Sequence, residues 1–282
     1  MKKLIVTVLV GFVFLSCFSQ EYIPSREDIN AFFKSKTLIV LEDNPLLEYN
    51  IKIKEVVQRD WKITDYEFIF YKEFDKKRLD PQFSFLLINK VYFEKDRLGV
   101  TYKFLSLLLG GNPGRISRMP DICSVPLGYF NVDEESYVYK LGSIIRFIQN
   151  HVKLINDNPN LISSNIFKFY NKNISDIKNK VFMVIEEELG KEVNTLTKIK
   201  KVYPYEVRFV SRSDIEKAID NKEENIVYLH KVGPEGTRKK ARCYKMIIGV
   251  DDSKFYYFDY HMINDKKPDG FLLSDFKKMP KR

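Results

Sequence analysis

The sequence predicts an α+β protein made of two tandem copies of one unit, in which a strand, a helix, a strand, a short helix and a β-meander follow in order. Two observations predict the duplication. Short apolar runs of β type end in acidic residues at both 37–41 and 181–185. At an offset of 144 residues, five positions within 37–55 are identical. We expect each copy to form a mixed sheet with helices on one face.

The elements of the first copy follow from local signals. After the first strand, Asn44 and Pro45 have the pattern of a helix N-cap and a first helical turn, and apolar residues then recur at helical spacing. Runs of β type separated by turn residues follow. We expect a strand around 66–70, a short helix at 73–79, and long strands at 83–94 and 100–109.

The second copy has the same order. A helical segment extends to about residue 202, and a strand follows at 205–210. Ser213 to Glu216 has the Ser-x-x-Glu form of a capping box, which predicts a short helix to about residue 219. Turn residues then separate three strands, which we expect at 225–232, 242–250 and 254–262.

Further helical segments flank the repeated unit. Ser25 and Asp28 resemble a capping box for a helix to residue 34, and an amphipathic stripe over 136–155 predicts a helix that covers the first sheet. A polar break at 156–160 separates it from a helical segment at 161–170. The order of elements is similar to that of small α+β modules in bacterial envelope proteins. No shared motif accompanies this likeness, so no residue role follows from it.

We therefore divide the chain into four parts. They are a signal peptide at 1–20, a first α+β domain at 21–155, a helical connector at 156–180 and a second α+β domain at 181–282. The signal peptide is indicated by two lysines, an apolar stretch over 4–14 and the small or semi-polar residues after it. The apolar stretch is shorter than the roughly 20 residues that a membrane-spanning helix needs. We expect the protein to be exported to the periplasm or beyond the cell.

Two processing routes compete at the end of the signal peptide. Cleavage before Gln20 would release a soluble protein. Alternatively, Leu15-Ser16-Cys17 resembles the end of a bacterial lipobox, in which Cys17 becomes a lipidated N-terminus that tethers the protein to a membrane. We favour cleavage before Gln20, because Phe14 and Leu15 depart from the residues that a lipobox prefers.

The composition is that of a folded protein. Hydrophobic residues make up 44% of the chain and aromatic residues 14%, which excludes a disordered chain. The net charge of +9 indicates non-specific attraction to anions rather than a particular site. Because an exported protein does not meet nucleic acid, we expect an envelope protein or an anionic surface as the partner.

Two cysteines remain after cleavage before Gln20. Cys123 and Cys243 can pair in an oxidising compartment, but the apolar neighbours of both equally fit free, buried thiols. Neither these cysteines nor the three histidines have the spacing of a structural zinc site, and no motif specifies a cofactor. We expect no metal and no cofactor.

The acidic residues after the first strand of each copy are the best-placed candidate ligand-binding residues. The carboxyl end of a strand that leads into a helix often binds ligands, and paired carboxylates suit acid–base chemistry. A helix N-terminus also attracts acids through its partial positive charge, which explains the same residues without any ligand. These candidates are Glu42, Asp43, Glu186 and Glu187, with Glu188 beside them.

Two basic segments are weaker candidates. Arg115 and Arg118 follow a glycine-rich loop at 110–114 that lacks the ending of a P-loop, so the pattern favours a plain turn over an anion site. A second segment, at a hairpin tip, suits an anionic surface or a solvated turn whose charges discourage edge-to-edge pairing. Its basic residues are Arg238, Lys239, Lys240 and Arg242.

The sequence contains no motif of a catalytic nucleophile or of a metal-dependent hydrolase. We therefore expect an exported, non-catalytic envelope protein that binds a partner protein or a surface. Two alternatives stand beside it. One is an exported hydrolase or transferase that uses the carboxylates at the strand–helix junctions, and the other is a small-ligand binder in a cleft between the copies.

Overall fold

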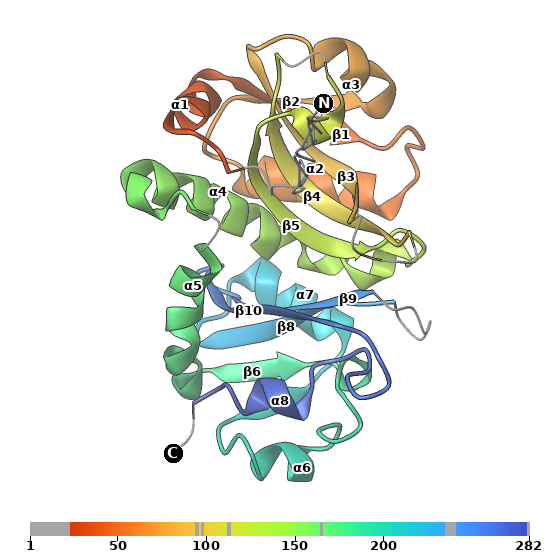
Figure 1. Ribbon diagram of the computed structural model, residues 1–282, viewed down its shortest axis with the longest axis vertical. Coiled ribbons are helices and arrows are strands. Elements are labelled where there is room, and N and C mark those ends of the chain that lie inside the picture. The colour runs from red at the N-terminus through yellow and green to blue at the C-terminus, as the bar shows by residue number, and fades with distance from the viewer. Residues whose placement is uncertain are drawn as a thin grey trace, which may run out of the picture.

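The computed structural model describes residues 23–93, 96, 99–111, 114–163, 166–234 and 241–280. It confirms the α+β architecture in two similar units, each built on one five-stranded mixed sheet (Figure 1). The predicted signal peptide with Cys17 lies outside the described residues, as does the hairpin tip that carries Arg238, Lys239 and Lys240.

The two sheets have the same topology strand for strand. The first has the order β2-β1-β3-β4-β5 and the second the order β7-β6-β8-β9-β10. In each, the first strand pairs in parallel with the second and third, and the last three form an antiparallel meander. The strands of the first copy are β1 (Lys36–Leu41), β2 (Tyr66–Phe70), β3 (Phe83–Tyr92), β4 (Thr101–Leu109) and β5 (Asp121–Tyr129). Those of the second are β6 (Val181–Val184), β7 (Val207–Phe209), β8 (Ile226–Val232), β9 (Arg242–Gly249) and β10 (Phe255–Met262).

The α-helices flank and join the two sheets. In the first copy they are α1 (Arg26–Lys34), α2 (Glu48–Asp60), α3 (Tyr71–Lys77) and α4 (Leu141–Asp157). Helix α5 (Ile166–Tyr170) lies in the connector, and the second copy contains α6 (Leu196–Lys200), α7 (Arg212–Asn221) and α8 (Leu273–Phe276). Short 3-10 helices lie at Glu134–Ser136, Val138–Lys140, Pro159–Leu161 and Asn171–Asn179, among other places. The predicted capping box at Ser25 and Asp28 is confirmed at the start of α1.

Several boundaries differ from those expected. Helix α2 begins at Glu48 rather than at Pro45, because Asn44 uses its side chain in a turn: its Oδ1 accepts the N–H of Leu46 at 3.1 Å. The capping box of α7 is formed by Ser211 and Asp214, two residues before the one predicted. The helix expected at 136–155 becomes regular only at Leu141.

Strand β5 is absent from the sequence prediction. Its residues include Pro126 and Gly128, both unfavourable inside a strand, and these conceal the β pattern. Pro126 is tolerated because β5 is the edge strand of the first sheet. With β5 in place, the first copy has the same three-stranded meander as the second.

Helices pack on both faces of the first sheet rather than on one. Ile39 lies in the same core cluster as residues of α2 and α4, whereas its neighbour Val40 lies in a separate cluster with Phe74 of α3. The crossovers through α2 and α3 run in opposite directions across the sheet, and right-handed connections therefore place the two helices on opposite faces.

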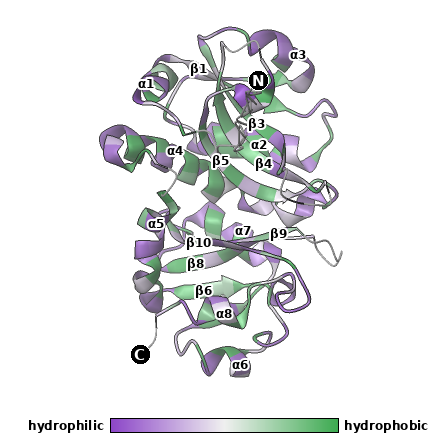
Figure 2. Ribbon diagram, viewed as in Figure 1, coloured by the Kyte–Doolittle hydropathy of each residue, from purple (hydrophilic) through white to green (hydrophobic). Residues whose placement is uncertain are grey.

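The copies meet directly, through different faces. The largest core cluster runs without interruption from α2 and α4 of the first copy to α7 of the second, and Phe147 of α4 stacks on Phe255 of β10 with ring centroids 3.6 Å apart. Helix α6, the counterpart of α2, instead packs on the outer face of the second sheet. Figure 2 shows the hydrophobic residues gathered on the strands of both sheets.

Side chains cover one edge of each sheet. The edge strand β5 faces the second copy, where Nε2 of His230 lies 2.8 Å from the carbonyl oxygen of Pro126. At the edge of β10, the amide of Asn171 both accepts the N–H of Phe258 and donates to its carbonyl, as a neighbouring strand would. Asn173 donates to the carbonyl of Phe255 in the same way.

Candidate functional site at the carboxyl end of β1

A group of charged and phenolic side chains gathers where β1 ends. Glu42 directly follows β1, and Lys90 of β3 lies directly opposite Lys103 of β4, so both lysines project from the same face of the sheet. The remaining members come from α2 and from the 3-10 segment before α4. We call this group the β1 site; its residues are Glu42, Tyr49, Lys90, Lys103, Glu134 and Tyr137.

Hydrogen bonds hold the two glutamates in place. The buried side chain of Asn50 accepts the N–H of Glu42 at 2.9 Å and donates to its carbonyl at 2.8 Å, which fixes the turn after β1. Oε2 of Glu134 accepts the N–H of Tyr49 at 3.0 Å. Glu134 therefore caps the N-terminus of α2. The N-cap residue of that helix, Leu47, has no side chain that could do so.

The charges of the β1 site face one another without forming ion pairs. Among the described residues, no ion pair within 4 Å joins either of its lysines to either of its glutamates. Nζ of Lys103 lies 3.4 Å from the carbonyl oxygen of Val132 and 5.3 Å from the ring centroid of Tyr137. Nζ of Lys90 lies 4.6 Å from the ring centroid of Phe130. Aromatic faces, and for Lys103 also the carbonyl of Val132, rather than carboxylates, contact the ammonium groups.

Two phenol groups are buried in the site with their hydrogen-bonding capacity unused. Tyr49 and Tyr137 each have 0% of their surface exposed, and neither hydroxyl has a hydrogen-bond partner within the described part of the chain. A buried polar group without a partner costs about 1–3 kcal/mol. A pair of such groups beside unpaired charges is therefore a place where additional polar atoms would be stabilised.

Burial shifts the acid–base behaviour of the site. It raises the pKa of Glu42, and the charges of Lys90 and Lys103 lower that pKa only in part. It lowers the pKa of Lys103, although the carboxylates of Glu134 and Glu42 oppose the change. It also raises the pKa of Tyr49 well above its usual value. The charged forms of Glu42 and Lys103 are thus poorly solvated by the protein itself.

The second copy has a different arrangement at its sheet, where the lysines are paired. Nζ of Lys231 lies 2.8 Å from Oδ2 of Asp269, and Nζ of Lys245 lies 2.6 Å from Oδ1 of Asp275. Glu188, which follows β6, is paired with Lys140 of the first copy. Lys231 and Lys245 lie opposite each other on β8 and β9, as Lys90 and Lys103 do on β3 and β4. The lysines of the second copy therefore have ion-pair partners, whereas those of the β1 site do not.

The other predicted acids play separate parts. Oδ1 of Asp43 accepts the N–H of Lys72 at 2.9 Å, in the first turn of α3. This supports the helix-capping explanation for Asp43, although the capped helix is α3 rather than α2. Glu186 and Glu187 are exposed to solvent. The two acidic runs therefore do not come together: the groups around Glu42 belong to the first copy, and only Glu188 reaches a residue of the other copy.

Arg115 and Arg118 lie at the opposite end of the first sheet from Glu42. Leu109, at the end of β4, pairs with Ser84, which pairs with Thr37 near the start of β1. In the glycine-rich loop after Leu109, the N–H groups of Gly110 and Gly111 donate to carbonyls of Phe83 and Arg78. These amides are engaged within the protein and do not form an anion site.

Of the four basic residues predicted at the hairpin, the structure describes Arg242. Its Nε lies 3.2 Å from Oδ1 of Asp96, and its guanidinium stacks on Phe93 with the carbon atom 3.7 Å from the ring centroid. Asp96 and Phe93 belong to the first copy and Arg242 to the second. Arg242 therefore joins the two copies rather than presenting a free positive charge.

Cys123 and Cys243 do not form a disulfide; both thiols are free and buried. They lie on sheets of different copies, where Cys243 donates a weak hydrogen bond to the carbonyl of Gly270. Burial raises the pKa of Cys243 to about 12, so its thiol is a packing group rather than a nucleophile. Within the described residues, no cluster of three or more His, Cys, Asp or Glu side chains is placed to hold a metal ion.

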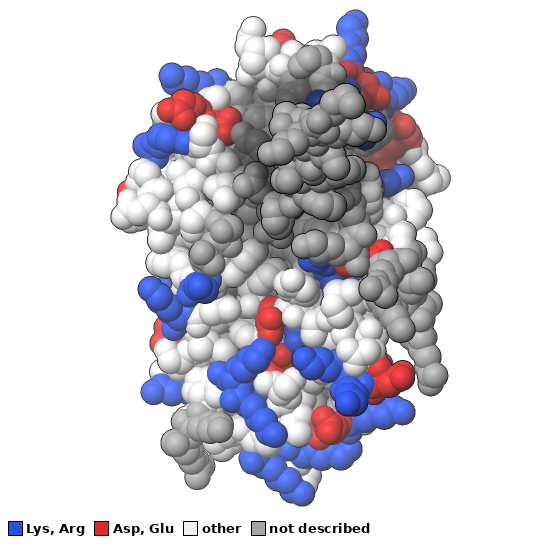
Figure 3. Space-filling model, in the orientation of Figure 1, with Lys and Arg blue, Asp and Glu red and all other residues white. Residues whose placement is uncertain are grey.

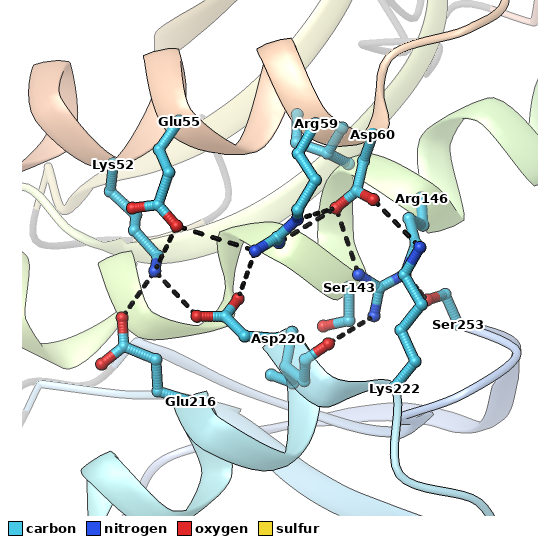
Figure 4. A network of polar contacts seen from close by, with 12 residues as sticks. Lys52, Glu55, Arg59, Asp60, Ser143, Arg146, Glu216, Asp220, Lys222 and Ser253 are labelled. Atoms are coloured by element: carbon cyan, nitrogen blue, oxygen red, sulfur yellow. Dashed lines mark hydrogen bonds and ion pairs between the residues drawn. The ribbon is translucent and has the colours of Figure 1, made fainter.

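A second polar cluster lies between the copies and has a structural role (Figure 4). Asp60 of α2 is almost completely buried among Arg59, Arg146 and Lys222, which come from α2, α4 and the end of α7. Burial alone would raise the pKa of Asp60, but the hydrogen bonds and charges of these cations outweigh it and hold the pKa below its usual value. Lys52 of α2 is likewise surrounded by Glu55, Glu216 and Asp220. The cluster joins three helices. Each of the charged side chains named here has a partner of opposite charge within the cluster, so none of them is left to bind a ligand.

A shallow hollow also opens at the amino ends of β1 and β2. It is lined by Lys36, Trp61 and residues 62–66. It lies at the end of the sheet opposite to Glu42, because parallel strands begin together and end together. It contains none of the groups of the β1 site.

Most of the β1 site could not be recognised in the sequence. Glu42 was identified because it follows a strand, but Tyr49, Lys90, Lys103, Glu134 and Tyr137 were not. One signal exists: Lys90 and Lys103 interrupt otherwise apolar strands, and a lysine at such a position needs a partner or a functional reason.

The sequence matches no protein-family model, and no curated protein or solved structure is significantly similar to it. In the described part of the chain, none of the helices combines the length and the apolar character needed to span a bilayer.

Proposed function

We propose that the chain is an exported, non-catalytic binding protein that holds a ligand at the β1 site. Export rests on the signal-peptide pattern of residues 1–20. One observation carries the binding role: the completely buried hydroxyls of Tyr49 and Tyr137 have no partner among the described residues, and they lie beside charges that are not paired. Binding is favoured over catalysis because no nucleophile motif accompanies these groups.

A bound ligand would offset two free-energy costs of the empty site, namely the unpartnered phenol hydroxyls and the poorly solvated charges. Polar atoms between the lysines and the glutamates would satisfy the two phenols and solvate Glu42 and Lys103, whose charged forms burial disfavours. The sheet supplies a rigid floor, and Glu134 is fixed to α2. Such a preformed site loses little conformational entropy when a ligand binds.

A thermal-shift screen of the mature protein against small envelope metabolites tests this proposal. We expect at least one compound to raise the melting temperature of the wild type but not that of the Glu42→Gln or Lys103→Met variant. Glu187→Gln is the control, because Glu187 is exposed and lies outside the site. A screen without hits, or hits that stabilise the wild type and the Glu42→Gln and Lys103→Met variants equally, would contradict the proposal.

A hydrolase is the second candidate, and the raised pKa of Glu42 favours it. Burial raises the pKa of Glu42, and a carboxyl group with a raised pKa is suited to act as a general acid; Glu134 is the second carboxylate of the site. In that case, Glu42→Gln would abolish turnover of a bound compound while its affinity changed little. Binding without turnover in the wild type would leave only the first proposal.

An anionic partner would meet the second copy rather than the first. Residues 181–282 contain 21 Lys and Arg against 17 Asp and Glu, whereas residues 21–155 contain 20 against 19. Figure 3 shows many Lys and Arg side chains on the second copy. Retention of the mature protein on a polyanionic resin at low salt, and its loss at high salt, would support contact with an anionic surface in the envelope.

A further inference from the structure

We infer that the β1 site takes a small zwitterion of the amino-acid class, with its carboxylate toward Lys90 and Lys103 and its ammonium group toward Glu42 and Glu134. This inference rests on the proposed function, namely that the site binds a ligand. It goes further by assigning both charges of that ligand.

The first argument is the balance of charge. The site has two ammonium groups on β3 and β4 and two carboxylates, after β1 and before α4. Lys90 is exposed, but burial disfavours the charged forms of Glu42 and Lys103, which have opposite signs. A ligand with a single charge would compensate only one of these two groups, whereas a zwitterion would compensate both.

The second argument is that the protein keeps its own opposite charges apart. Long lysine side chains would ordinarily swing onto nearby carboxylates, yet here they lie over the rings of Phe130 and Tyr137. Glu134 is held by the N–H of Tyr49. The charges are thus positioned for groups that come from outside, which is the arrangement expected of a preorganised site.

The third argument concerns the phenols. Tyr49 is completely buried, its hydroxyl has no partner among the described residues, and both Glu42 and Glu134 influence its pKa. The hydroxyl of Tyr137 is in the same situation, with Glu134 and Glu42 nearby. A hydroxyl can donate to a carboxylate or accept from an ammonium group, so the two phenols suit either end of a zwitterion.

Asp43 and Glu135 are acidic residues next to the β1 site in the sequence, but they do not make it a site for a simple cation. Asp43 accepts the N–H of Lys72, and Oε2 of Glu135 lies 3.6 Å from Arg212. A cation without an anionic group would also leave Lys103 buried beside it, which is electrostatically unfavourable. A neutral sugar would satisfy the hydroxyls but would compensate none of the charges.

Isothermal titration calorimetry on the full mature protein, with a matched set of probes, tests the inference. The zwitterions are L-alanine, L-leucine, L-glutamate, L-lysine and the dipeptide Ala-Ala. N-acetyl-alanine has only the negative charge, alanine amide only the positive charge, and glucose neither. We expect at least one zwitterion to bind more than tenfold tighter than its singly charged analogues and glucose.

Variants assign the binding to the site. Lys103→Met and Glu42→Gln should each weaken zwitterion binding more than tenfold, Lys103→Arg should weaken it less than Lys103→Met, and Glu187→Gln should change nothing. Melting curves recorded in parallel show whether each variant is folded. If Lys103→Met fails to fold, the comparison of Lys103→Arg with wild type, in the presence of the same probes, carries the test.

The results separate the inference from the proposed function. Equal or tighter binding of N-acetyl-alanine, alanine amide or glucose, lost in Lys103→Met, overturns the zwitterion and leaves the binding function intact. No binding of any probe also overturns the zwitterion. The binding function itself fails if the metabolite screen gives no compound whose stabilising effect depends on Glu42 and Lys103.

Discussion

Lys140 and Glu188 form an ion pair across the boundary between the copies, with Nζ of Lys140 3.2 Å from Oε1 of Glu188. The side chain of Lys140 has no solvent exposure, and that of Glu188 is 13% exposed. Lys140 ends the 3-10 segment that follows Glu134, so one short stretch of chain reaches both the β1 site and the end of β6. The two copies are therefore joined by a buried charge pair as well as by apolar packing.

Removing one partner of this pair should be costly. Glu188→Gln leaves the ammonium group of Lys140 buried without its counter-charge, and we expect a loss of about 3–5 kcal/mol in the free energy of unfolding, measured by urea denaturation. Glu187→Gln is the matched control, since its exposed side chain should matter by less than about 0.5 kcal/mol. Equal effects of the two substitutions would contradict the role of the pair.

Asp43→Ala should destabilise the protein through α3. The substitution removes the acceptor for the N–H of Lys72, and loss of a comparable cap costs about 0.5–2 kcal/mol. The melting temperature should fall, while ligand binding at the β1 site should be retained. If binding is lost and stability is unchanged, Asp43 has a ligand-binding rather than a capping role.

Two tyrosines offer a matched comparison of satisfied and unsatisfied hydroxyls. The hydroxyl of Tyr228 lies 2.6 Å from that of Ser143, and Tyr228→Phe should lower stability by about 1 kcal/mol. Tyr49→Phe removes an unpartnered hydroxyl, so the ligand-free protein should be unchanged or more stable. Denaturation of both variants measures the difference, and the opposite ranking would mean that the hydroxyl of Tyr49 has a partner in solution.

We expect the free energy of unfolding to decrease at acidic pH because two histidines are buried. Burial lowers the pKa of His151 to about 4 and that of His230 to about 3. Both rings stay neutral in the folded protein, while in the unfolded chain they bind protons below about pH 6.5. The unfolded state then holds more protons, so stability is complete above that pH and decreases as the pH falls toward 4.

His230→Leu gives the test of this pH dependence. Its unfolding free energy should decrease less steeply between pH 6.5 and pH 4.5 than that of the wild type, although its value at pH 7 is lowered by loss of the contact with Pro126. An unchanged slope would show that His230 is not the group that titrates.

The cysteines should be inert in the folded protein. Burial raises the pKa of both the Cys123 and the Cys243 thiols, and neither is bonded to the other. A thiol reagent should therefore modify both residues in denaturant and neither of them in buffer. A reductant should leave the melting temperature unchanged; a fall would reveal a disulfide in the protein.

The fold was largely predictable because its signals are local. The apolar runs of β1 and β6, the capping box at Ser25 and the turns of the second meander are all read from neighbouring residues. Strand β5 was missed because Pro126 and Gly128 do not fit a strand by themselves. Pro126 is tolerated because β5 is an edge strand, a position that depends on the pairing of β4 with β5 rather than on neighbouring residues.

The candidate site was predictable only at Glu42. Whether Lys103 comes near enough to Glu42 to influence its pKa depends on the pairing of β3 with β4 and on the path of residues 130–137, which no local pattern encodes. Asp43 shows the same limit: the tendency of acids to lie at helix N-termini was recognised, but the helix that it caps is set by β2 ending beside β1.

The amide side chains of Asn171 and Asn173 have a consequence for folding. Two copies with identical strand order, tethered in one chain, are prone to exchange strands with each other or with a second molecule. By occupying the backbone groups of β10 as a strand would, these asparagines remove one of the templates for such exchange. The two asparagines thus protect the β10 edge against pairing with a strand of another molecule.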